Sequence, residues 1–493
     1  MRRKLLVLPV DARPVVCGQL QYLAQLADWD IALPPTSMLG HFRQSANHGR
    51  LGEWLVERAG EVDGFVLSLD TLLYGGLVAS RISPETAGGI LARAEWLETL
   101  NRIHPAKPIY GFLTTLRISN SNINEEEKPY WSSYGELIWK WSYHADRHRT
   151  HGNDKDWHAA KEARLKIPAD IQRDYVETRA RNLKITGAML DFARRGVIER
   201  LIIARDDNAP HGFHVAERQG LEKKIADAGL RDKVEMYCGA DEVAWTLAAR
   251  MISRLENRRP RKVYLSWHHP EDAGTMIPRY EDQPIGAAVE NQLLAAGADI
   301  ASDIKGADLV LAIHTANQPQ GDWALGKSLK VRKPVDSAWM AALRRWRDGG
   351  LQIAIADLAH ANGGDPGFVG LALSSLDFGN IIAYGAWNTA SNSLGTVAAQ
   401  IQLSPLGRTS APGTKLKLIR LIDDVFYQAA YRQLIRRKIA SGAWTLEEAK
   451  PHFCHAANEW LRANSIQSAE VRNAFFPWGR SFEIGFEVES GLS

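Results

Sequence analysis

The sequence predicts an α/β protein with parallel strands, arranged either as a (β/α)8-barrel-like fold or as a doubly wound sheet, with additional α/β strands and a mainly helical C-terminal region. Short apolar runs alternate with amphipathic segments over roughly the first 400 residues, which is the pattern of strands joined by crossover helices. Polar or ionisable residues follow many of these runs, at the strand ends where parallel α/β folds hold their ligands. A break containing Pro, Gly and Ser at 403–412 separates this part from long amphipathic segments.

The first 116 residues alternate between the two types of element. We expect strands at 5–11, 30–35, 64–70 and 108–116, each a short apolar run bounded by turn-forming or polar residues. Helices are expected at 18–28, 48–62 and 83–101, the last with Ser83 as its N-cap and Pro84 in its first turn. This βα alternation favours a parallel sheet.

The segment 118–165 interrupts the alternation and is unusually aromatic for a polar stretch. Its aromatic residues are Tyr130, Trp131, Tyr134, Trp139, Trp141, Tyr143 and Trp157. One interpretation is a subdomain with its own small core, or a contact between two copies in a homodimer. The other is a lid over the site, with at least one of Trp131, Trp139 and Trp141 facing the cavity.

The alternation resumes after the insertion and continues to about residue 400. We expect helices at 168–195, 245–256, 285–296, 337–347 and 391–401, and strands at 201–204, 262–267, 307–317, 352–356 and 380–384. The expected strands outnumber the eight of a single (β/α)8 barrel, so the strands at 30–35 and 307–317 would have to lie outside such a barrel. We therefore divide the chain into an α/β region at 1–260, its continuation or a second smaller α/β domain at 261–402, and a C-terminal domain at 403–493 with helices at 415–439 and 446–463 and a terminal strand.

Composition excludes several classes of function. The net charge of +3, without a long basic run, argues against a nucleic-acid-binding protein. No apolar run approaches the length of a membrane span, and the first is too short for a secretory signal, so we expect a cytoplasmic protein that does not bind membranes. The three cysteines are far apart, which is typical of reduced thiols and not of a zinc knuckle.

The apolar run at 201–204 leads directly into Arg205, Asp206 and Asp207. Two close, partly desolvated carboxyls tend to divide into one protonated and one ionised group, which supplies both an acid and a base. Neighbours on a regular strand point to opposite faces, so the pair converges only if Asp207 already lies in the loop. Otherwise the partner acid would come from another strand, most plausibly Asp241 or Glu242. The plainer alternative is that Asp206 caps the next helix and Asp207 is solvated.

Carbohydrate chemistry fits the residues that follow the strands. The chain has no GxGxxG, GxxxxGK[ST] or GxSxG motif, which disfavours a nucleotide cofactor and a nucleophile-elbow hydrolase. Paired carboxylates with carboxamides and an indole suit the cleavage of a glycosidic bond in a small-molecule carbohydrate substrate, without a cofactor. We assign Asp206 and Asp207 as catalytic and expect these substrate-binding residues: Asp11, Arg13, Asp70, Tyr74, Arg117, Asp241, Glu242, Asp357, Asn362, Trp387, Asn388 and Asn392.

Two other classes of function stay open. A metal-dependent hydrolase or isomerase would use strand-end ligands from Asp11, Asp70, Asp206, Asp241, Glu242, His268, His269 and His314, although no HExxH or HxH motif is present, and we assign no metal ligand. A non-catalytic carbohydrate-binding protein is the third reading, and it requires that substitution of the Asp pair leave any activity intact.

Several blocks resemble those of a bacterial family known as a domain of unknown function. They are DxRP at 11–14, SLDTLLYGGLVASR at 68–81, ARDDNAPHG at 204–212, GADE at 239–242 and AYGAWNTASNSLGT at 383–396. The strand-end Asp pair and the later Trp-Asn block are also similar to the retaining N-acetylhexosaminidases of the O-GlcNAcase kind. That resemblance implies that Asp206 orients and polarises the acetamide of the substrate and that Asp207 is the general acid.

Overall fold

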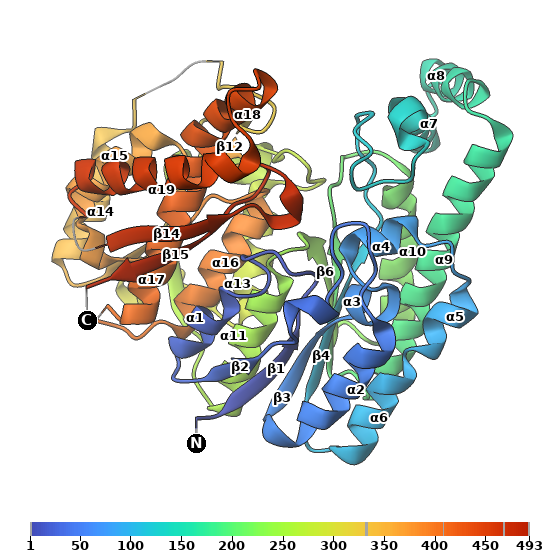
Figure 1. The fold of residues 1–493 in the computed structure, drawn as a ribbon, viewed down its shortest axis with the longest axis horizontal. Coiled ribbons are helices and arrows are strands. Elements are labelled where there is room, and N and C mark those ends of the chain that lie inside the picture. Colours follow the sequence, from blue (N-terminus) through green and yellow to red (C-terminus); the bar gives the residue numbers. More distant parts are fainter. Residues whose placement is uncertain (1, 331–333, 408, 467–468, 492–493) are drawn as a thin grey trace.

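The computed structural model describes residues 2–330, 334–407, 409–466 and 469–491 and contains two large parallel sheets (Figure 1). The first sheet has six strands in the order β2-β1-β3-β4-β5-β6. Its strands are β1 (Lys4–Leu8), β2 (Asp30–Ala32), β3 (Gly64–Ser68), β4 (Ile109–Thr115), β5 (Arg200–Arg205) and β6 (Val234–Cys238). The chain goes from β1 to one edge, returns, and continues on the other side of β1, which is the doubly wound arrangement.

Alternating side chains of these strands feed two cores. Leu6 and Leu8 of β1 pack with the helices of one face, whereas Leu5 and Val7 pack with those of the other, as the two-residue period of a strand requires. The first face carries α2 (His48–Arg58), α3 (Leu69–Tyr74), α5 (Ala87–Ala92), α6 (Glu95–Ile103), α9 (Ala169–Arg194) and α10 (Phe213–Asp227). The second carries α1 (Leu20–Gln25) and α11 (Val243–Leu255).

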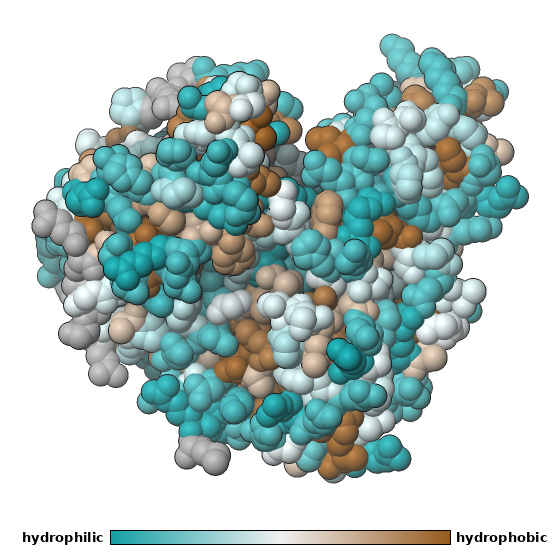
Figure 2. Space-filling view, in the orientation of Figure 1, coloured by the Kyte–Doolittle hydropathy of each residue, from teal (hydrophilic) through white to brown (hydrophobic). Residues whose placement is uncertain are grey.

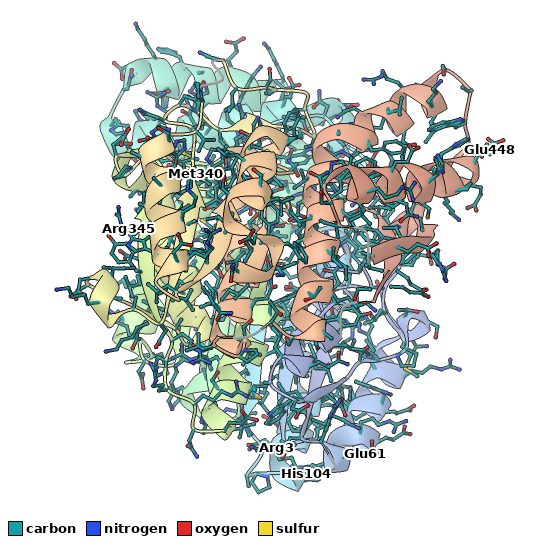
Figure 3. The ribbon with its side chains drawn as sticks, turned by 90° about the vertical axis from the view of Figure 1, so that its left-hand side faces the viewer. Arg3, Glu61, His104, Met340, Arg345 and Glu448 are labelled. Atoms are coloured by element: carbon teal, nitrogen blue, oxygen red, sulfur yellow. The ribbon has the colours of Figure 1, made fainter. Side chains whose placement is uncertain are left out.

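The second sheet has five parallel strands in the order β13-β11-β9-β7-β8. They are β7 (Lys262–Trp267), β8 (Asp299–Ile300), β9 (Leu309–His314), β11 (Gln352–Asp357) and β13 (Ile381–Gly385). One face is covered by α12 (Asp272–Thr275), α13 (Ile285–Ala296) and α16 (Ala390–Leu403), and the other by α14 (Ser337–Asp348) and α15 (Pro366–Leu376). Met340 and Arg345 mark α14 in Figure 3. Two short strands, β10 (Gly321–Asp322) and β12 (His360–Ala361), pair beside this sheet.

The helix α16 joins the two halves of the molecule. All of its residues are buried. Ala399 and Leu403 belong to a core of the first sheet, whereas Leu394 and Val397 belong to a core of the second. The division of the chain near residues 260 and 403 therefore stays a prediction, since one helix fills space in both cores.

The insertion forms an antiparallel helix pair, α7 (Trp131–His151) and α8 (Asp154–Leu165), which projects from the body (Figure 1). Gly152 ends α7 at a φ of 65°, a left-handed conformation that glycine adopts easily. Figure 2 shows the surface hollowed between this projection and the opposite lobe, which contains the second sheet and the C-terminal elements.

The C-terminal region is mainly helical, as expected, and ends in an antiparallel strand pair. Its elements are α17 (Ala411–Arg420), a π-helix (Leu421–Tyr431), α18 (Arg432–Ala440), α19 (Leu446–Ala463), β14 (Ala469–Phe475) and β15 (Gly485–Ser490). The expected single helix at 415–439 is thus continuous but changes its winding. No helix among the described residues is long and apolar enough to cross a membrane.

Two expectations are wrong. The barrel alternative fails because the described strands form open sheets and none of these closes on itself. The runs at 30–35 and 307–317 are an edge strand and a central strand of the two large sheets. The expected helix at 83–101 is two helices, α5 and α6, and Thr86 caps α5 while Ser83 ends α4 (Leu77–Ile82). Ser83 is extended because the following Pro84 disfavours the helical conformation there.

Candidate active site

The carboxyl ends of β3 to β6, the start of α16 and the connection between β14 and β15 surround a cavity of about 90 Å³, which we call the acid–base cavity. Its lining residues are Arg13, Leu77, Arg81, Arg117, Glu126, Arg205, Asp206, Asp207, Gly239, Ala240, Asp241, Tyr280, Glu281, Asn388, Thr389, Asn392, Trp478, Arg480, Phe482 and Glu483. Charged and amide side chains dominate this wall, so the cavity suits a small polar ligand.

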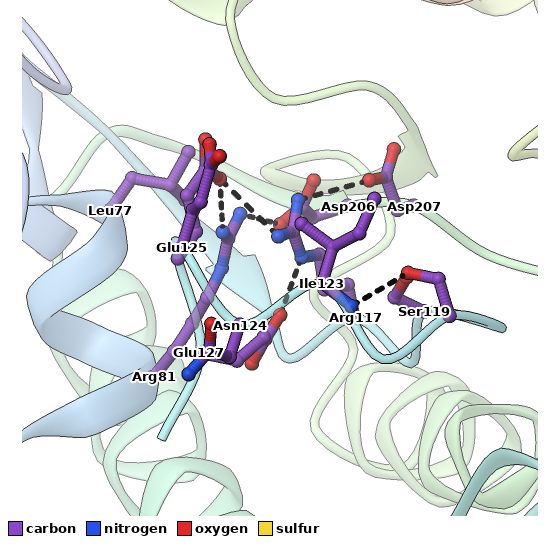
Figure 4. Close-up of polar contacts among 12 residues, drawn as sticks. Leu77, Arg81, Arg117, Ser119, Ile123, Asn124, Glu125, Glu127, Asp206 and Asp207 are labelled. Carbon is purple, nitrogen blue, oxygen red and sulfur yellow. Dashed lines mark hydrogen bonds and ion pairs between the residues drawn. The ribbon is translucent and has the colours of Figure 1, made fainter. Parts of the chain in front are cut away.

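Asp206 and Asp207 converge on this cavity because the strand has ended. The strand β5 ends at Arg205, and Asp207 has a φ of 20°, which lies outside the extended region. The pair is therefore in a turn, the condition under which neighbouring side chains can share one face. Asp206 accepts a hydrogen bond from Arg81 Nη2 at 2.5 Å, and Asp207 accepts one from Arg117 Nη1 at 3.1 Å (Figure 4).

The two carboxyls have unequal surroundings. Burial raises the pKa of Asp207 to about 7, and the negative charge of Asp206 contributes further, while Arg117 and Arg81 oppose the shift. The side chain of Asp207 is still 28% exposed, because it borders the cavity, whereas that of Asp206 is 10% exposed and is ion-paired with Arg81. Near neutral pH Asp207 can thus hold a proton beside Asp206, which is ion-paired with Arg81.

Glu126 connects the two arginines that hold the pair. Its carboxylate contacts Arg81 at 2.7 Å and Arg117 at 3.3 Å, and Arg480 Nη2 contacts it at 2.7 Å. Burial would raise the pKa of Glu126, but these three guanidinium groups outweigh burial and hold the pKa well below its usual range. The charge of Glu126 fixes the arginines, so each presents a defined N–H group to its aspartate.

Arg13 organises the opposite wall. Its guanidinium contacts Asp11 at 2.8 Å, Glu483 at 3.2 Å, and Asp241. Burial raises the pKa of Asp241 to about 6 against the effect of Arg13, and Asn388 Nδ2 donates to its carboxyl at 3.1 Å. This wall therefore adds a second carboxyl that can change its protonation near neutral pH.

Glu281 is a further carboxyl whose pKa is raised, besides those of Asp207 and Asp241. It is 2% exposed, and its Oε1 accepts a hydrogen bond from the Ser391 N–H at the start of α16 at 2.7 Å. Its Oε2 has no hydrogen-bond partner among the residues that the structure describes. Burial raises the pKa of Glu281 to about 7. A buried polar atom without a partner costs free energy, which a ligand in the cavity can recover.

The connection between β14 and β15 brings two aromatic side chains to the cavity, Trp478 and Phe482. Trp478 has a φ of 56°, and the Cζ atom of Arg13 lies 5.0 Å from the centre of its ring. Arg480 lies 4.8 Å from the same ring and 5.4 Å from that of Phe482. Arginine over aromatic faces fixes this connection against the wall.

The structure separates the sequence-predicted residues into three groups. Those on the cavity wall are Arg13, Arg117, Asp206, Asp207, Asp241, Asn388 and Asn392. Five others are buried near the carboxyl ends of the first sheet but outside the lining: Asp11, Asp70, Tyr74, Glu242 and Trp387. Asp357 is the last residue of β11 in the second sheet and accepts a hydrogen bond from the Tyr384 hydroxyl, and Asn362 follows β12 and donates to Asp322. Trp387 is 2% exposed and packs in a core of the first sheet.

The prediction that a tryptophan of the insertion faces the cavity as part of a lid is wrong. Trp131, Trp139 and Trp141 are absent from the described lining of the cavity. They pack instead in a small core, where Trp131 contacts Tyr175 with ring centres 5.8 Å apart. Tyr175 belongs to α9 and Phe213, in the same core, belongs to α10, so the insertion shares this core with helices of the first sheet and does not have one of its own. The insertion contributes Glu126 to the site, from the loop before α7.

Several lining residues escaped prediction. Arg81 is the last residue of the block at 68–81, and its position after β3 could have indicated that it lies at the cavity. Tyr280 and Glu281 lie in a loop with no such signal. Trp478, Arg480, Phe482 and Glu483 come from the far end of the chain, where the alternating pattern predicts only a half-exposed strand.

The described residues include no group of three or more His, Cys, Asp or Glu side chains that could hold a metal ion. Of the strand-end residues considered for a metal, His268, His269 and His314 lie on the second sheet, whereas the acids lie at the first.

Fold and cavity together define a doubly wound α/β protein with two parallel sheets and a charged ligand cavity. The chain belongs to the family described as "Protein of unknown function (DUF4127)", which matches residues 5–487. No curated protein matches it. Two crystal structures of Anabaena Alr3699/HepE, one with UDP and glucose and one with UDP, cover 89% of this chain and 100% of their own at 10% identity. Their TM-score of 0.17 is too low to support an argument.

Proposed function

We propose that the protein is a glycoside hydrolase that cleaves a small sugar or amino-sugar glycoside with Asp206 and Asp207 as its paired carboxyls. The observation that carries this proposal is their convergence on one cavity with unequal environments. Asp206 is charge-paired with Arg81, while burial raises the pKa of Asp207 to about 7. A glycosidase needs such a pair, one carboxyl that donates a proton and one that stays ionised.

Asp207 is the general acid in this proposal. Its proton goes to the glycosidic oxygen as the bond between that oxygen and the anomeric carbon breaks, so the leaving alcohol departs neutral. In an N-acetylated substrate, the ionised Asp206 accepts the acetamide N–H, and the acetamide oxygen attacks the anomeric carbon. A water molecule then attacks the anomeric carbon as the bond between that carbon and the acetamide oxygen breaks; the water gives one proton to Asp207, and the acetamide is restored.

The remaining wall offers groups for the sugar itself. Asn392 Oδ1 accepts from the N–H groups of Ala240 and Asp241, at 3.3 and 3.2 Å, so its amide N–H groups stay available for hydroxyls. Trp478 and Phe482 add apolar ring surface to this wall, beside the arginines that lie over their faces.

Substitution of each aspartate tests the proposal. A panel of 4-nitrophenyl and alkyl glycosides, including N-acetylglucosaminides, is assayed with the wild type, Asp206→Asn, Asp207→Asn and the exposed control Asp191→Asn. Loss of the general acid should lower kcat on alkyl glycosides on the order of a hundredfold or more, and less on aryl glycosides, whose leaving group needs little protonation. The control should match the wild type.

The pH profile gives an independent readout. Since Asp207 acts in its protonated form, kcat/KM should fall above a pKa of about 7, and Asp207→Asn should remove this alkaline limb. Wild-type rates in both variants on an accepted glycoside would refute the assignment. Tight sugar binding by calorimetry, without hydrolysis of any glycoside in the panel, would replace it with a carbohydrate-binding function.

A further inference from the structure

The insertion contacts the loop that carries the catalytic pair. Residues 206–212 join β5 to α10, and we call them the acid loop. Its far end lies against α7, the first helix of the insertion. Trp141 packs edge-on against Phe213, the first residue of α10, with ring centres 5.0 Å apart and planes at 88°. Tyr143 meets His211 in the same way, with ring centres 5.5 Å apart. The helix α7 therefore reaches the segment between the catalytic pair and α10.

The helix α7 also supplies polar contacts that α10 needs at its start. The N-cap position of α10 is Gly212, which has no side chain to accept hydrogen bonds from the first N–H groups of the helix. The Phe213 N–H donates instead to Ser142 Oγ at 2.7 Å, and the Gly212 N–H donates to Asp146 Oδ2 at 3.2 Å. Ser142 and Asp146 lie four residues apart on α7, so they share one face of that helix. A carboxylate at the start of a helix also stabilises the helix dipole.

Asp146 contacts a second group of the acid loop. The same oxygen lies 3.2 Å from Nδ1 of His211, while the Oδ1 atom accepts a hydrogen bond from Arg149 Nη2 at 2.6 Å. Asp146 is buried, so removal of its carboxylate would leave the buried Gly212 N–H without this acceptor. One side chain of the insertion thus fixes two successive residues of the acid loop.

The near end of the acid loop is fixed by other elements. Asp206 directly follows β5, and the Asn208 N–H donates to Tyr280 O, in the loop after α12, at 2.7 Å. Asp207 lies between these contacts with a φ of 20°, a conformation that persists only where surrounding contacts impose it. The position of its carboxyl beside Arg117 therefore depends on how firmly both ends of the loop are held.

We propose that Asp146 and Ser142 are positioning residues, which hold the acid loop so that Asp207 stays in its buried place beside Arg117. This inference rests on the proposed hydrolysis of glycosides, in which Asp207 is the general acid. Neither positioning residue is among the described residues that line the acid–base cavity, so both act through the loop and not on the substrate. The insertion then has a defined part in the reaction, because α7 braces the loop that carries the acid.

The effect of α7 should be visible in the acidity of Asp207. Burial raises the pKa of this carboxyl from an ordinary 3.8 to about 7. A loop released from α7 moves more freely and lets water reach Asp207, which lowers the pKa toward the ordinary value. The charged or titratable groups that face Asp207 are unchanged in such a variant; they are Asp206, Arg81, Arg117, Glu126 and Tyr280.

Asp146→Ala tests the proposal without reference to activity. Carboxyl ¹³C NMR of protein labelled in its aspartates gives the pKa of Asp207, whose signal is the one missing from Asp207→Asn. Hydrogen exchange followed by mass spectrometry reports on the Gly212 and Phe213 amides. In Asp146→Ala the pKa should fall by at least about 0.5, and these amides should exchange at least about threefold faster. Ser142→Ala should change both quantities in the same direction.

Asp156→Ala is the matched control. Asp156 is a buried carboxylate of α8 that lies 2.7 Å from His144 Nδ1 of α7, so its removal breaks an Asp–His contact inside the insertion. The pKa of Asp207 and the amide exchange should both stay at wild-type values in this variant. Asp146→Asn keeps one oxygen acceptor for the loop and should change them less than Asp146→Ala does, and it carries the test if the alanine variant does not fold.

Kinetics on an accepted alkyl glycoside connect α7 to the reaction. In Asp146→Ala, kcat should fall about tenfold or more, and the alkaline limb of kcat/KM should move to lower pH by as much as the pKa of Asp207 does. Wild-type pKa and exchange in both Asp146 variants would overturn the proposal, as would equal changes in Asp156→Ala. A changed pKa and changed exchange in a protein that hydrolyses no glycoside would support the bracing of the loop by α7 and overturn the proposed function instead.

Discussion

Arg13 offers a direct test of how the acid–base cavity is held together. Its side chain is 6% exposed and forms ion pairs with three buried carboxyls, those of Asp11, Asp241 and Glu483. Arg13→Met keeps much of the apolar length of the side chain and removes the charge. The variant therefore leaves buried acids facing one another without their shared cation.

The burial of Arg13 and its partners determines how much stability Arg13→Met should lose. Removing one partner of a buried ion pair typically costs about 3–5 kcal/mol, because the remaining charge is left uncompensated. Burial already raises the pKa of Asp241 to about 6 in the presence of Arg13, and removal of Arg13 would raise this pKa further. At pH 5 the carboxyl can then take up a proton, so the penalty should shrink to roughly the 1–3 kcal/mol of unmade hydrogen bonds.

Thermal unfolding followed by circular dichroism at pH 7.5 and pH 5.0 measures both values. For a unit of about 250 residues, the expected loss at pH 7.5 corresponds to a Tm lower by on the order of 10 °C, and the loss at pH 5.0 should be less than half of that. The control Arg58→Met removes an exposed pair with Glu61, in which both side chains are about half exposed, and should shift Tm by less than about 1 °C. Equal losses at the two pH values, or a shift as small as the control's, would refute the reasoning.

Two further predictions concern the GADE segment. Burial raises the pKa of Glu242 to about 8 from an ordinary 4.5, so the folded protein holds a proton that the unfolded chain releases. The stability that this group contributes is full below about pH 4.5 and is lost as pH rises to about 8, at up to about 1.4 kcal/mol per pH unit. Glu242→Gln cannot lose a proton in this range, so its Tm should fall less between pH 6 and 8 than the Tm of the wild type. Parallel Tm profiles of the two proteins would contradict this. Gly239 has a φ of 134°, and an added Cβ would overlap the Glu242 carboxyl, so Gly239→Ala should lose several degrees of Tm or fail to fold. Gly60→Ala, where an added Cβ meets nothing within 4 Å, should stay within about 2 °C of the wild type in differential scanning calorimetry, and equal losses in the two glycine variants would show the explanation to be wrong.

The sequence predicted that several polar side chains would meet at the carboxyl ends of the first sheet, for a physical reason. Parallel strands bring their carboxyl ends to one edge, so Arg117 after β4, Asp206 after β5 and Asp241 after β6 had to lie near one another. The turn at Asn208-Ala209-Pro210 likewise indicated that Asp207 leaves the strand, and its φ of 20° agrees.

Strand order and long-range contacts were beyond the reach of the sequence pattern. The alternation of strands and helices is the same in a barrel and in two open sheets, so it could not decide between them. Trp387 has the residue type of a sugar-binding group, yet it packs in a core, because hydrophobic burial competes for the same indole. Arg480 and Glu483 reach the cavity through tertiary packing of the β14–β15 pair, which no local periodicity encodes.

The burial of α16 on both sides has a consequence for motion. Many two-lobed α/β proteins admit ligands by rotating one lobe away from the other about a hinge. Here such a rotation would pull either Ala399 and Leu403 or Leu394 and Val397 out of an apolar core, at about 1.5–3 kcal/mol for each large side chain exposed. The connection between β14 and β15 is held by side-chain contacts, among them those of Arg480 with Glu126, Arg13 with Glu483 and the Tyr427 hydroxyl with Ser481 O, which can break and reform locally. A ligand should therefore enter the acid–base cavity through a local movement of this connection, while the two sheets keep their mutual orientation.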